Sequence, residues 1–426
     1  MDADLKLGKN GCLLINTFMT VEAEDRLVQI VADENIPLLE QFFSEFGEIR
    51  KVAGRTMTSE DVKDADILLV RSVTKVDEAL IANSSVKFIG TCTIGTDHID
   101  LAYLESLNQQ RKANNQQKIA FSSAPGCNAE AVVDYVLSAV SVLIDKRDQI
   151  FQDISVGIIG VGNVGMRLRG RLEAMGVTVI AVDPFKNAAE VGELSTLDDA
   201  LKADVVSLHI PITMSEDAGE HATHHLINAQ RLQQMKPNAC LINTCRGSVV
   251  DNTALKSHMD TFADFESIID VWEGEPNLDL QLMNRCMLAT PHIAGYSLDG
   301  KMRGTEQIYK ACCQTFGLPI RNKLAQYLPE PSIKKIKFGD SVPVRQALRT
   351  AIRAVYEVRV DDGIMRSTLL RTNGEAQAMR TQFDLLRKNY PLRRDIPTMR
   401  VEVPSKRQDL QQALEAAGFD VRMGKR

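Results

Sequence analysis

A glycine-rich turn between two apolar segments is the feature that most restricts the fold of this chain. Residues Val156–Ile159 have the composition of a buried strand, and the sequence GVGNVG follows at 160–165. A helical segment then runs to Gly176, and a second apolar segment, Val177–Val182, ends in Asp183. A strand, a GxGxxG turn, a helix and a second strand with a terminal acid are typical of a dinucleotide-binding βαβ unit.

Each glycine of this turn has its own physical role. Gly160 permits the tight turn, Gly162 lets the backbone approach a pyrophosphate, and Gly165 allows the helix to pack closely on the strand. The helix N-terminus offers free N–H groups to a phosphate. Asp183 can accept hydrogen bonds from a ribose diol and would repel a 2′-phosphate, which favours NAD over NADP. The alternative is a glycine turn that binds nothing, and the completeness of the unit argues against it.

Short apolar segments alternate with helical segments on both sides of this unit, which favours α/β architecture with parallel sheets. We predict strands at Val28–Ala32, Ile67–Val70, Phe88–Gly90, Ile119–Phe121, Val205–His209, Cys240–Asn243, Ser267–Val271 and Met287–Ala289. A long helix is predicted after Asn128, and another over Val344–Arg353. Residues 1–28 are interpreted as an extension, and the polar segment NQQRKANNQQ at 108–117 as a surface loop.

Composition excludes several classes of protein. The 426 residues are 44% hydrophobic and 25% charged, as in a globular protein, and no segment reaches the ~20 apolar residues of a membrane span. The eight cysteines include no CxxC pair, so we interpret them as reduced thiols of a cytoplasmic protein. Residues 331–426 carry 20 Lys and Arg against 11 Asp and Glu. No nucleic-acid motif accompanies this basic segment, so we expect no nucleic-acid partner and no membrane partner.

Three segments that follow later predicted strands carry reactive side chains: NTCRG contains Arg246, DVWEGEP contains Glu275, and PHIAGY contains His292. Ligands of an open parallel sheet bind at the carboxyl ends of its strands, so we expect these groups to meet beside a nicotinamide. Histidine suits the removal of an alcohol proton near neutral pH, and a carboxylate would orient its ring. A guanidinium can grip a substrate carboxylate. Taken singly, the three also fit a surface ion pair, a turn residue and a buried structural histidine.

The order of these motifs resembles the D-isomer-specific 2-hydroxyacid dehydrogenases. Further matching segments are VADENIP, VRSVTKV, GTCTIGTDHID, SAPGCNAEAVVDYV and HIAGYSLDGKMRGT. The segment FDLLRKNYPLRRD at 383–395 resembles the C-terminal domain of one branch of that family, and generic members lack this domain. The resemblance implies NAD-dependent oxidation of a small phosphorylated hydroxy acid, with Arg246 and Glu275 supporting catalysis and His292 exchanging the proton.

The same resemblance implies the other site residues and the division of the chain. Substrate would be contacted by Ser72, Thr93 and Tyr296. The NAD site would be lined by Gly160, Gly162, Asn163, Val164, Gly165, Asp183, Thr244, Cys245, Arg246, Asp270 and Gly295. The expected fold has two Rossmann-like, doubly wound parallel-sheet domains that flank a cleft. The substrate domain would comprise 29–127 and 297–330, the NAD domain 128–296, and a small α+β domain at 331–426 would form a homodimer.

Three alternatives remain open at this point. His221, His224 and His225 have a metal-like spacing, but no ligands from a second element accompany them, so we expect no metal. A different D-2-hydroxyacid dehydrogenase, such as one acting on 3-phosphoglycerate, would carry the same reactive groups. A noncatalytic NAD(H)-sensing protein could retain them as well.

Overall fold

The computed structural model describes residues 27–424 and divides into two compact units. The first unit contains residues up to Asn128 together with Asp299–Pro329, and the second contains Ala129–Leu298 and Glu330–Arg426. The predicted N-terminal extension therefore lies almost wholly outside the described residues. The separation of 331–426 as a third domain stays a prediction.

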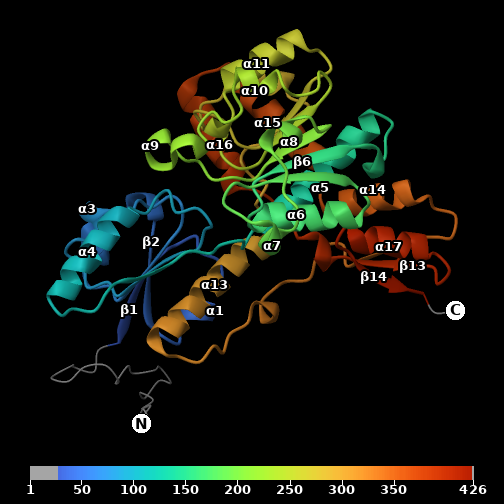
Figure 1. Cartoon of the computed structure of the whole chain (residues 1–426). Coiled ribbons are helices and arrows are strands. Elements are labelled where there is room, and N and C mark those ends of the chain that lie inside the picture. The colour runs from blue at the N-terminus through green and yellow to red at the C-terminus, as the bar shows by residue number, and fades with distance from the viewer. Residues whose placement is uncertain (1–26, 425–426) are drawn as a thin grey trace. The chain divides into compact units, whose positions relative to one another are not determined.

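The first unit is built on a five-stranded parallel sheet in the order β2-β1-β3-β4-β5. Its strands are β1 (Val28–Asp33), β2 (Gly47–Val52), β3 (Ile67–Val70), β4 (Phe88–Thr91) and β5 (Ala120–Ser122). Its helices are α1 (Leu39–Phe43), α2 (Ser59–Val62), α3 (Glu78–Ile81), α4 (Leu101–Ala113) and nearly all of α13 (Leu298–Phe316). Figure 1 shows α13 beside α1, although they are far apart in the sequence, and the rings of Phe42 and Tyr309 lie 5.2 Å apart between them.

The second unit contains a six-stranded parallel sheet in the order β11-β10-β9-β8-β6-β7. Its strands are β6 (Ser155–Ile159), β7 (Thr178–Val182), β8 (Val205–Leu208), β9 (Cys240–Asn243), β10 (Glu266–Ile269) and β11 (Leu288–Ala289). The associated helices are α5 (Ala129–Lys146), α6 (Asn163–Ala174), α7 (Ala188–Val191), α8 (Leu197–Leu201), α9 (Ser215–Ala218), α10 (Ala229–Leu232), α11 (Asn252–Thr261) and α12 (Leu280–Arg285). The strand order reverses between β6 and β8, which is where sheets of this kind bind ligands. The predicted doubly wound parallel fold is confirmed.

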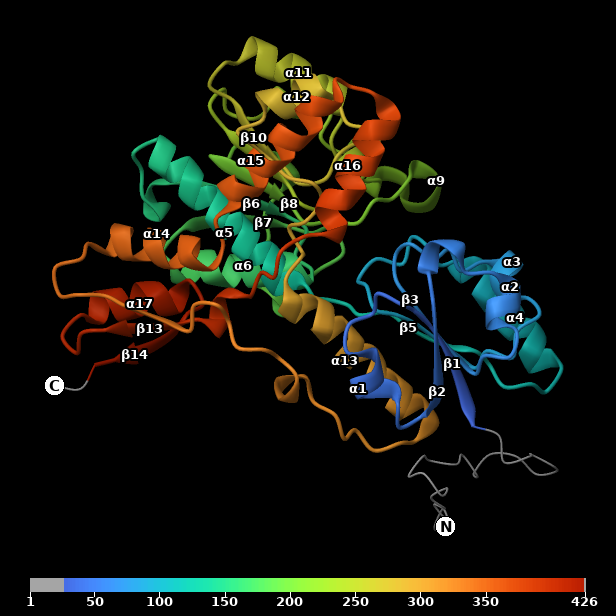
Figure 2. The same cartoon turned by 180° about the vertical axis from the view of Figure 1, so that it is seen from behind.

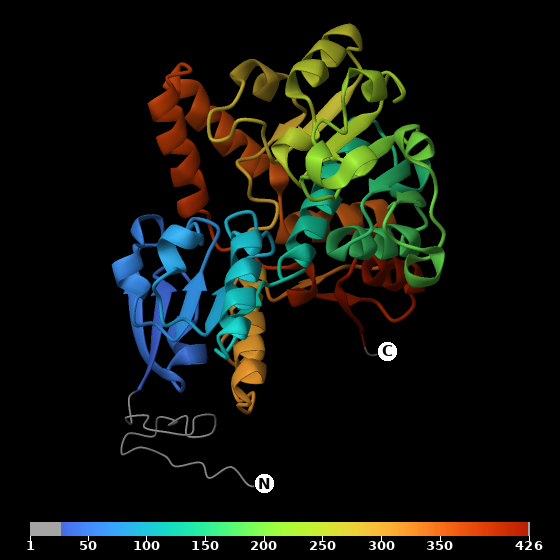
Figure 3. The same cartoon turned by 60° about the vertical axis from the view of Figure 1, so that its left-hand side comes forward.

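The C-terminal segment adds a small parallel sheet and four helices to this unit. The elements are β12 (Lys335–Lys337), α14 (Val344–Val355), α15 (Val358–Leu369), α16 (Ala376–Lys388), β13 (Arg400–Val403), α17 (Gln408–Ala416) and β14 (Asp420–Met423), with sheet order β12-β13-β14. Figure 2 shows α14 next to α5, and Figure 3 shows the orange-red helices against the yellow part of the same unit. Phe383 and Met365 belong to the same apolar cluster as Trp272, so this segment shares a core with the sheet.

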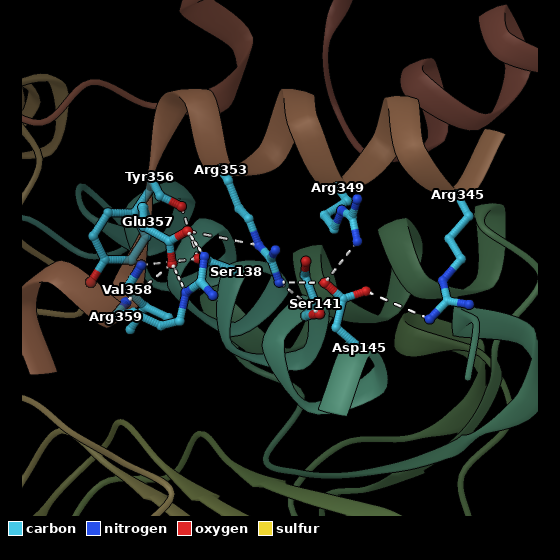
Figure 4. Close-up of polar contacts among 10 residues, drawn as sticks. All are labelled: Ser138, Ser141, Asp145, Arg345, Arg349, Arg353, Tyr356, Glu357, Val358 and Arg359. Carbon is cyan, nitrogen blue, oxygen red and sulfur yellow. Dashed lines mark hydrogen bonds and ion pairs between the residues drawn. The ribbon is translucent and has the colours of Figure 1, made fainter. Parts of the chain in front are cut away.

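Polar contacts join α14 to α5 (Figure 4). Three arginines, one helical turn apart, approach a single carboxylate: Arg345, Arg349 and Arg353 all pair with Asp145. The shortest of these contacts joins Arg353 Nη2 to Asp145 Oδ2 at 2.7 Å. Ser138 on α5 also donates a hydrogen bond of 2.8 Å to the carbonyl of Tyr356. The contacts fix the start of the C-terminal helices on a core helix of the unit.

The predicted loop at 108–117 is wrong in its first part. Helix α4 continues to Ala113 and includes residues 108–113. Gln, Arg, Lys and Ala are good helix formers, so a polar composition does not by itself indicate a loop. The helix ends at Asn114, and Asn115 adopts a left-handed conformation with φ of 54°.

Among the described residues, no helix is both long and apolar enough to cross a membrane. The seven cysteines in this part of the chain are free and buried, and Cys12 lies outside it.

Candidate active site

The three glycines of the turn between β6 and α6 differ in their surroundings. Gly160 has φ of +95°, a conformation that side chains disfavour. A Cβ on Gly165 would lie 2.0 Å from the carbonyl oxygen of Gly160, so helix and turn approach too closely for any side chain. A Cβ on Gly162 would meet nothing within 4 Å, which leaves open space beside the start of α6. That space is where a pyrophosphate would meet the N–H groups of Asn163 and Val164.

Two further observations at the strand ends fit a bound dinucleotide. Asp183 follows β7, and its carboxylate accepts hydrogen bonds from the N–H groups of Val161 at 2.9 Å and Phe185 at 3.0 Å. Thr244 follows β9, and its Oγ1 is buried without a hydrogen-bond partner. An unpaired buried hydroxyl is costly, so it suits a position that a ligand completes. The next residue, Cys245, is buried, and its thiol lies 3.2 Å from Asn243 Oδ1.

His292 and Glu275 form a hydrogen-bonded pair. Glu275 Oε1 lies 2.5 Å from His292 Nδ1, and Oε2 accepts a hydrogen bond from the N–H of Trp272 at 3.1 Å. Burial acts to raise the pKa of Glu275, but the hydrogen bond and charge of His292 and the charge of Arg387 outweigh it, so the pKa lies below its usual value. Glu275 is therefore ionised and able to orient the imidazole. His292 has φ of 58°, a strained conformation of the kind that occurs at functional sites.

The loop that carries His292 is held by Asp270, at the end of β10. The Asp270 carboxylate accepts hydrogen bonds from the N–H groups of Ile293 at 2.8 Å and Ala294 at 2.9 Å. It also accepts one from the Thr290 hydroxyl at 2.7 Å. Burial raises the pKa of Asp270, although these donors and His292 oppose the shift. The carboxylate thus orders the loop up to Ala294, and its predicted contact with NAD stays a prediction.

Arg246 lies in a turn that is packed tightly on the Glu275 loop. A Cβ on the adjacent Gly247 would lie 2.0 Å from the carbonyl oxygen of Trp272, so the two backbones are in direct contact. The Trp272 indole donates to the carbonyl of Thr290 at 2.9 Å, which ties the Glu275 loop to the His292 loop. The three predicted catalytic residues therefore occupy three adjoining loops of one unit.

The predicted substrate residues are divided between the two units. In the first unit, Ser72 and Thr93 each lie two residues beyond the paired strand ends Val70 and Thr91, so both follow the carboxyl ends of adjacent strands. Thr93 Oγ1 lies 2.8 Å from Thr91 Oγ1. In the second unit, Tyr296 follows the His292 loop, and its N–H donates to the carbonyl of Ile293 at 2.8 Å.

The structure adds a second element to the histidines that the sequence analysis set aside. His225 Nε2 lies 2.6 Å from Glu273 Oε1, and the rings of His224 and His225 stack with centroids 4.1 Å apart. Ligand-capable atoms of these three residues lie within 4.8 Å of one another. The hydrogen bond to Glu273 accounts for the position of His225, and the absence of a metal stays a prediction.

Sequence reasoning missed the side chains that support the pair. The Tyr135 hydroxyl on α5 lies 2.7 Å from Thr290 Oγ1, which in turn bonds Asp270. Tyr135 lies more than a hundred positions before Thr290 and Asp270, and no local motif links it to them. The one available signal was an aromatic residue in a helix that contains no other.

A known protein family and curated relatives match this chain. Residues 145–294 match the family described as D-isomer specific 2-hydroxyacid dehydrogenase, NAD binding domain. A curated erythronate-4-phosphate dehydrogenase of Pseudomonas putida (strain W619) is 47% identical over 390 residues, which are 91% of this chain and 98% of the relative. The chain belongs to the erythronate-4-phosphate dehydrogenase family. The resemblance to D-isomer-specific 2-hydroxyacid dehydrogenases is thereby confirmed, and residues 145–294 form an NAD-binding domain.

A second relative agrees with this membership, and two solved structures share the fold. The relative from Hahella chejuensis (strain KCTC 2396) is 45% identical over 92% of this chain and 99% of its own. A D-lactate dehydrogenase from Aquifex aeolicus, solved with NAD and lactic acid, has a TM-score of 0.54 and 25% identity over 68% of this chain and 96% of its own. An NAD+-bound 3-phosphoglycerate dehydrogenase from Entamoeba histolytica has a TM-score of 0.56 at 24% identity, over 68% and 96%. Residues 327–418 match a domain of unknown function, DUF3410.

Proposed function

We propose that this protein oxidises 4-phospho-D-erythronate to (R)-3-hydroxy-2-oxo-4-phosphobutanoate with NAD, a step of pyridoxine 5′-phosphate biosynthesis. The observation that carries the proposal is the identity of 45% or more to erythronate-4-phosphate dehydrogenases over nearly their whole length. The match includes the C-terminal segment. The hydrogen-bonded His292 and Glu275 supply the acid–base chemistry that such an oxidation needs.

Each residue of the pair has one task in this reaction. His292 Nε2 accepts the proton of the C2 hydroxyl, since Nδ1 is engaged by Glu275. Glu275 fixes the ring and stabilises the imidazolium that forms, as the acid of a catalytic triad does. Bound NAD would supply the acceptor for the hydride that leaves C2. Arg246 holds the substrate carboxylate and stabilises negative charge that develops on the adjacent oxygen.

Residues at the ends of β6, β7, β9 and β10 would hold NAD. Gly162, Asn163 and Val164 would hold the pyrophosphate, and Asp183 the adenine ribose. Thr244, Cys245, Arg246, Asp270 and Gly295 would line the nicotinamide side. Ser72, Thr93 and Tyr296 would contact the substrate, and the first unit would be its binding domain, with residues 29–127 and 297–330.

The proposal is tested by mixing the protein with NAD and 4-phospho-D-erythronate and following NADH absorbance. Both multiple-turnover and single-turnover assays are run. A protein that keeps NADH bound after one reaction would show little activity in the multiple-turnover assay. The expected result is NADH formation with 4-phospho-D-erythronate and little with 3-phosphoglycerate. A clear preference for 3-phosphoglycerate would overturn the substrate assignment. Tight NAD binding without reduction in either assay would favour an NAD(H)-sensing protein.

We also propose a cytoplasmic homodimer formed through residues 331–426. Support comes from large apolar side chains exposed on the C-terminal segment: Val360, Ile364, Leu370, Leu385 and Leu392, with exposures of 56%, 45%, 41%, 39% and 76%. Several large exposed apolar side chains in one segment are typical of an association surface. Sedimentation velocity should give twice the chain mass, and Ile364→Glu should give the monomer. A parent protein that sediments as a monomer at assay concentration would contradict the dimer.

A further inference from the structure

Arg387, on the last turn of α16, contacts aromatic rings but makes no ion pair with any of the described residues. Its side chain is half-buried, and its Nε is fully buried without a hydrogen-bond partner. Within residues 27–424, no hydrogen bond or ion pair reaches its guanidinium. Arg353 also has one unpaired buried nitrogen and Arg393 has two, but other nitrogens of each are bonded, Arg353 to Asp145 and Arg393 to the carbonyl of Ala294. A buried guanidinium nitrogen without an acceptor is costly, so this position suits a ligand that supplies the acceptor.

Aromatic rings hold the guanidinium in place. Its central carbon lies 5.7 Å from the ring centroid of Tyr296 and 5.9 Å from that of Phe383, which is buried on the same helix. Aromatic faces attract a guanidinium and orient it without using its N–H donors. The donors therefore stay available in a fixed direction.

Arg387 lies beside the proposed reaction centre. Tyr296 is four residues beyond His292, and the Arg387 charge is close enough to Glu275 to lower the pKa of that carboxyl. Arg387 also lies beyond residues 145–294, the part that matches the common NAD-binding domain. The C-terminal segment thus adds one cation to a dehydrogenase centre that already contains Arg246 for a carboxylate.

We propose that Arg387 binds the phosphate group of the substrate and so selects a phosphorylated hydroxy acid over an unphosphorylated one. This assignment rests on the proposed function. A phosphate dianion near the Glu275 carboxylate needs a compensating cation, and a guanidinium meets phosphate oxygens with two parallel N–H donors. Tyr296 acts as a positioning residue, because its ring supports the guanidinium.

The test compares Arg387→Met, Arg387→Lys and a control, Arg380→Met, which changes an exposed arginine of the same helix. For each we measure kcat/KM with 4-phospho-D-erythronate and with D-erythronate, and the competitive inhibition constant of inorganic phosphate. NAD affinity and thermal midpoint report on folding. Arg387→Met should lower kcat/KM for the phosphorylated acid by ~10- to 100-fold and weaken inhibition by phosphate at least tenfold. Its activity on D-erythronate should fall less than its activity on the phosphorylated acid, and its NAD affinity should stay within about twofold of the parent.

The variants separate the possible outcomes. Arg387→Lys keeps a point charge and should recover part of the loss, whereas Arg380→Met should match the parent. An equal loss on both acids, or unchanged inhibition by phosphate, would overturn the role of Arg387. If D-erythronate is too slow to measure, phosphate inhibition alone decides. If Arg387→Met is unstable, Arg387→Lys decides: phosphate inhibition that is weaker than in the parent supports the role, whereas inhibition equal to that of the parent opposes it. A parent that does not oxidise 4-phospho-D-erythronate contradicts the proposed function instead.

Discussion

His292 Nδ1 and Glu275 Oε1 lie 2.5 Å apart, although the two residues follow different strands of the sheet. The contact leaves Nε2 as the nitrogen that can exchange a proton with substrate. We propose that His292 exchanges the proton and that Glu275 orients its ring, and these two roles can be tested separately.

Replacing the proposed base should remove turnover without removing cofactor binding. His292→Gln is expected to lower kcat by ~10²- to 10⁴-fold, because positioned general bases contribute about that much. NAD affinity, measured by calorimetry, should change little, since the glycine turn and Asp183 are untouched. A variant with parental kcat would show that another group takes the proton.

Glu275→Gln should affect both rate and stability, and the stability effect has a defined pH dependence. The folded protein lowers the pKa of Glu275, so the ionised form favours folding. This contribution is present above the unfolded pKa, about 4.3, and is lost as pH falls through the folded value. We expect the variant to be less stable than the parent at neutral pH and the difference to shrink below about pH 4. Urea unfolding of both proteins across that range checks the sign, and a difference that grows on acidification would contradict it.

Gly162 and Gly165 lie in one turn, but their replacement by alanine should affect different properties, NAD binding at Gly162 and stability at Gly165. Gly162→Ala adds a methyl group to open space, so the free protein should keep its thermal midpoint while NAD binding weakens. Gly165→Ala would bring the methyl to 2.0 Å from a carbonyl oxygen, so it should destabilise the fold by roughly 1–3 kcal/mol. Denaturant unfolding and NAD titration of both variants make the comparison. Similar losses of stability in both would refute the distinction.

The buried chain of hydroxyls behind His292 predicts a graded effect. Tyr135→Phe removes one hydrogen bond and leaves Thr290 paired with Asp270, so it should cost about 1 kcal/mol. Thr290→Val leaves the Tyr135 hydroxyl and one Asp270 acceptor buried without this partner, so it should cost about 2–3 kcal/mol. The free energy of unfolding measures both. A larger loss of unfolding free energy for Tyr135→Phe than for Thr290→Val would contradict the assignment of Thr290 as the hydroxyl that donates to Asp270.

Whether an element could be predicted from the sequence depends on how its side chains are buried. The central strands of the second unit are buried on both faces, so their continuous apolar sequences, such as Cys240–Asn243, are recognisable in isolation. Strand β2 was missed because Gly47–Val52 is an edge strand with alternating exposure and charged residues, and it pairs with β1 alone. The polar end of α4 was assigned to a loop because its composition carries no apolar pattern.

The candidate site also has features that local sequence patterns predict and features that they do not. Strand ends and glycine spacing predicted the elements that bring His292 and Glu275 together. The Tyr135 hydroxyl and the unpaired charge of Arg387 depend on contacts between distant segments, so no local pattern contains them. Arg387 was part of the segment singled out at 383–395, but its lack of a partner is visible only once the fold is known.

Arg393 extends from the C-terminal segment to the carbonyl oxygens of Ala131 and Ala294, and its guanidinium carbon lies 3.8 Å from the Tyr356 ring centroid. Ala294 is two residues from His292. Shortening the polypeptide after residue 330 would therefore not yield a minimal dehydrogenase, because it would remove Arg393 from the carbonyl oxygens of helix α5 and of the loop that carries His292. Residues 331–426 are thus an internal support of the unit that contains His292 and cannot be treated as a detachable module.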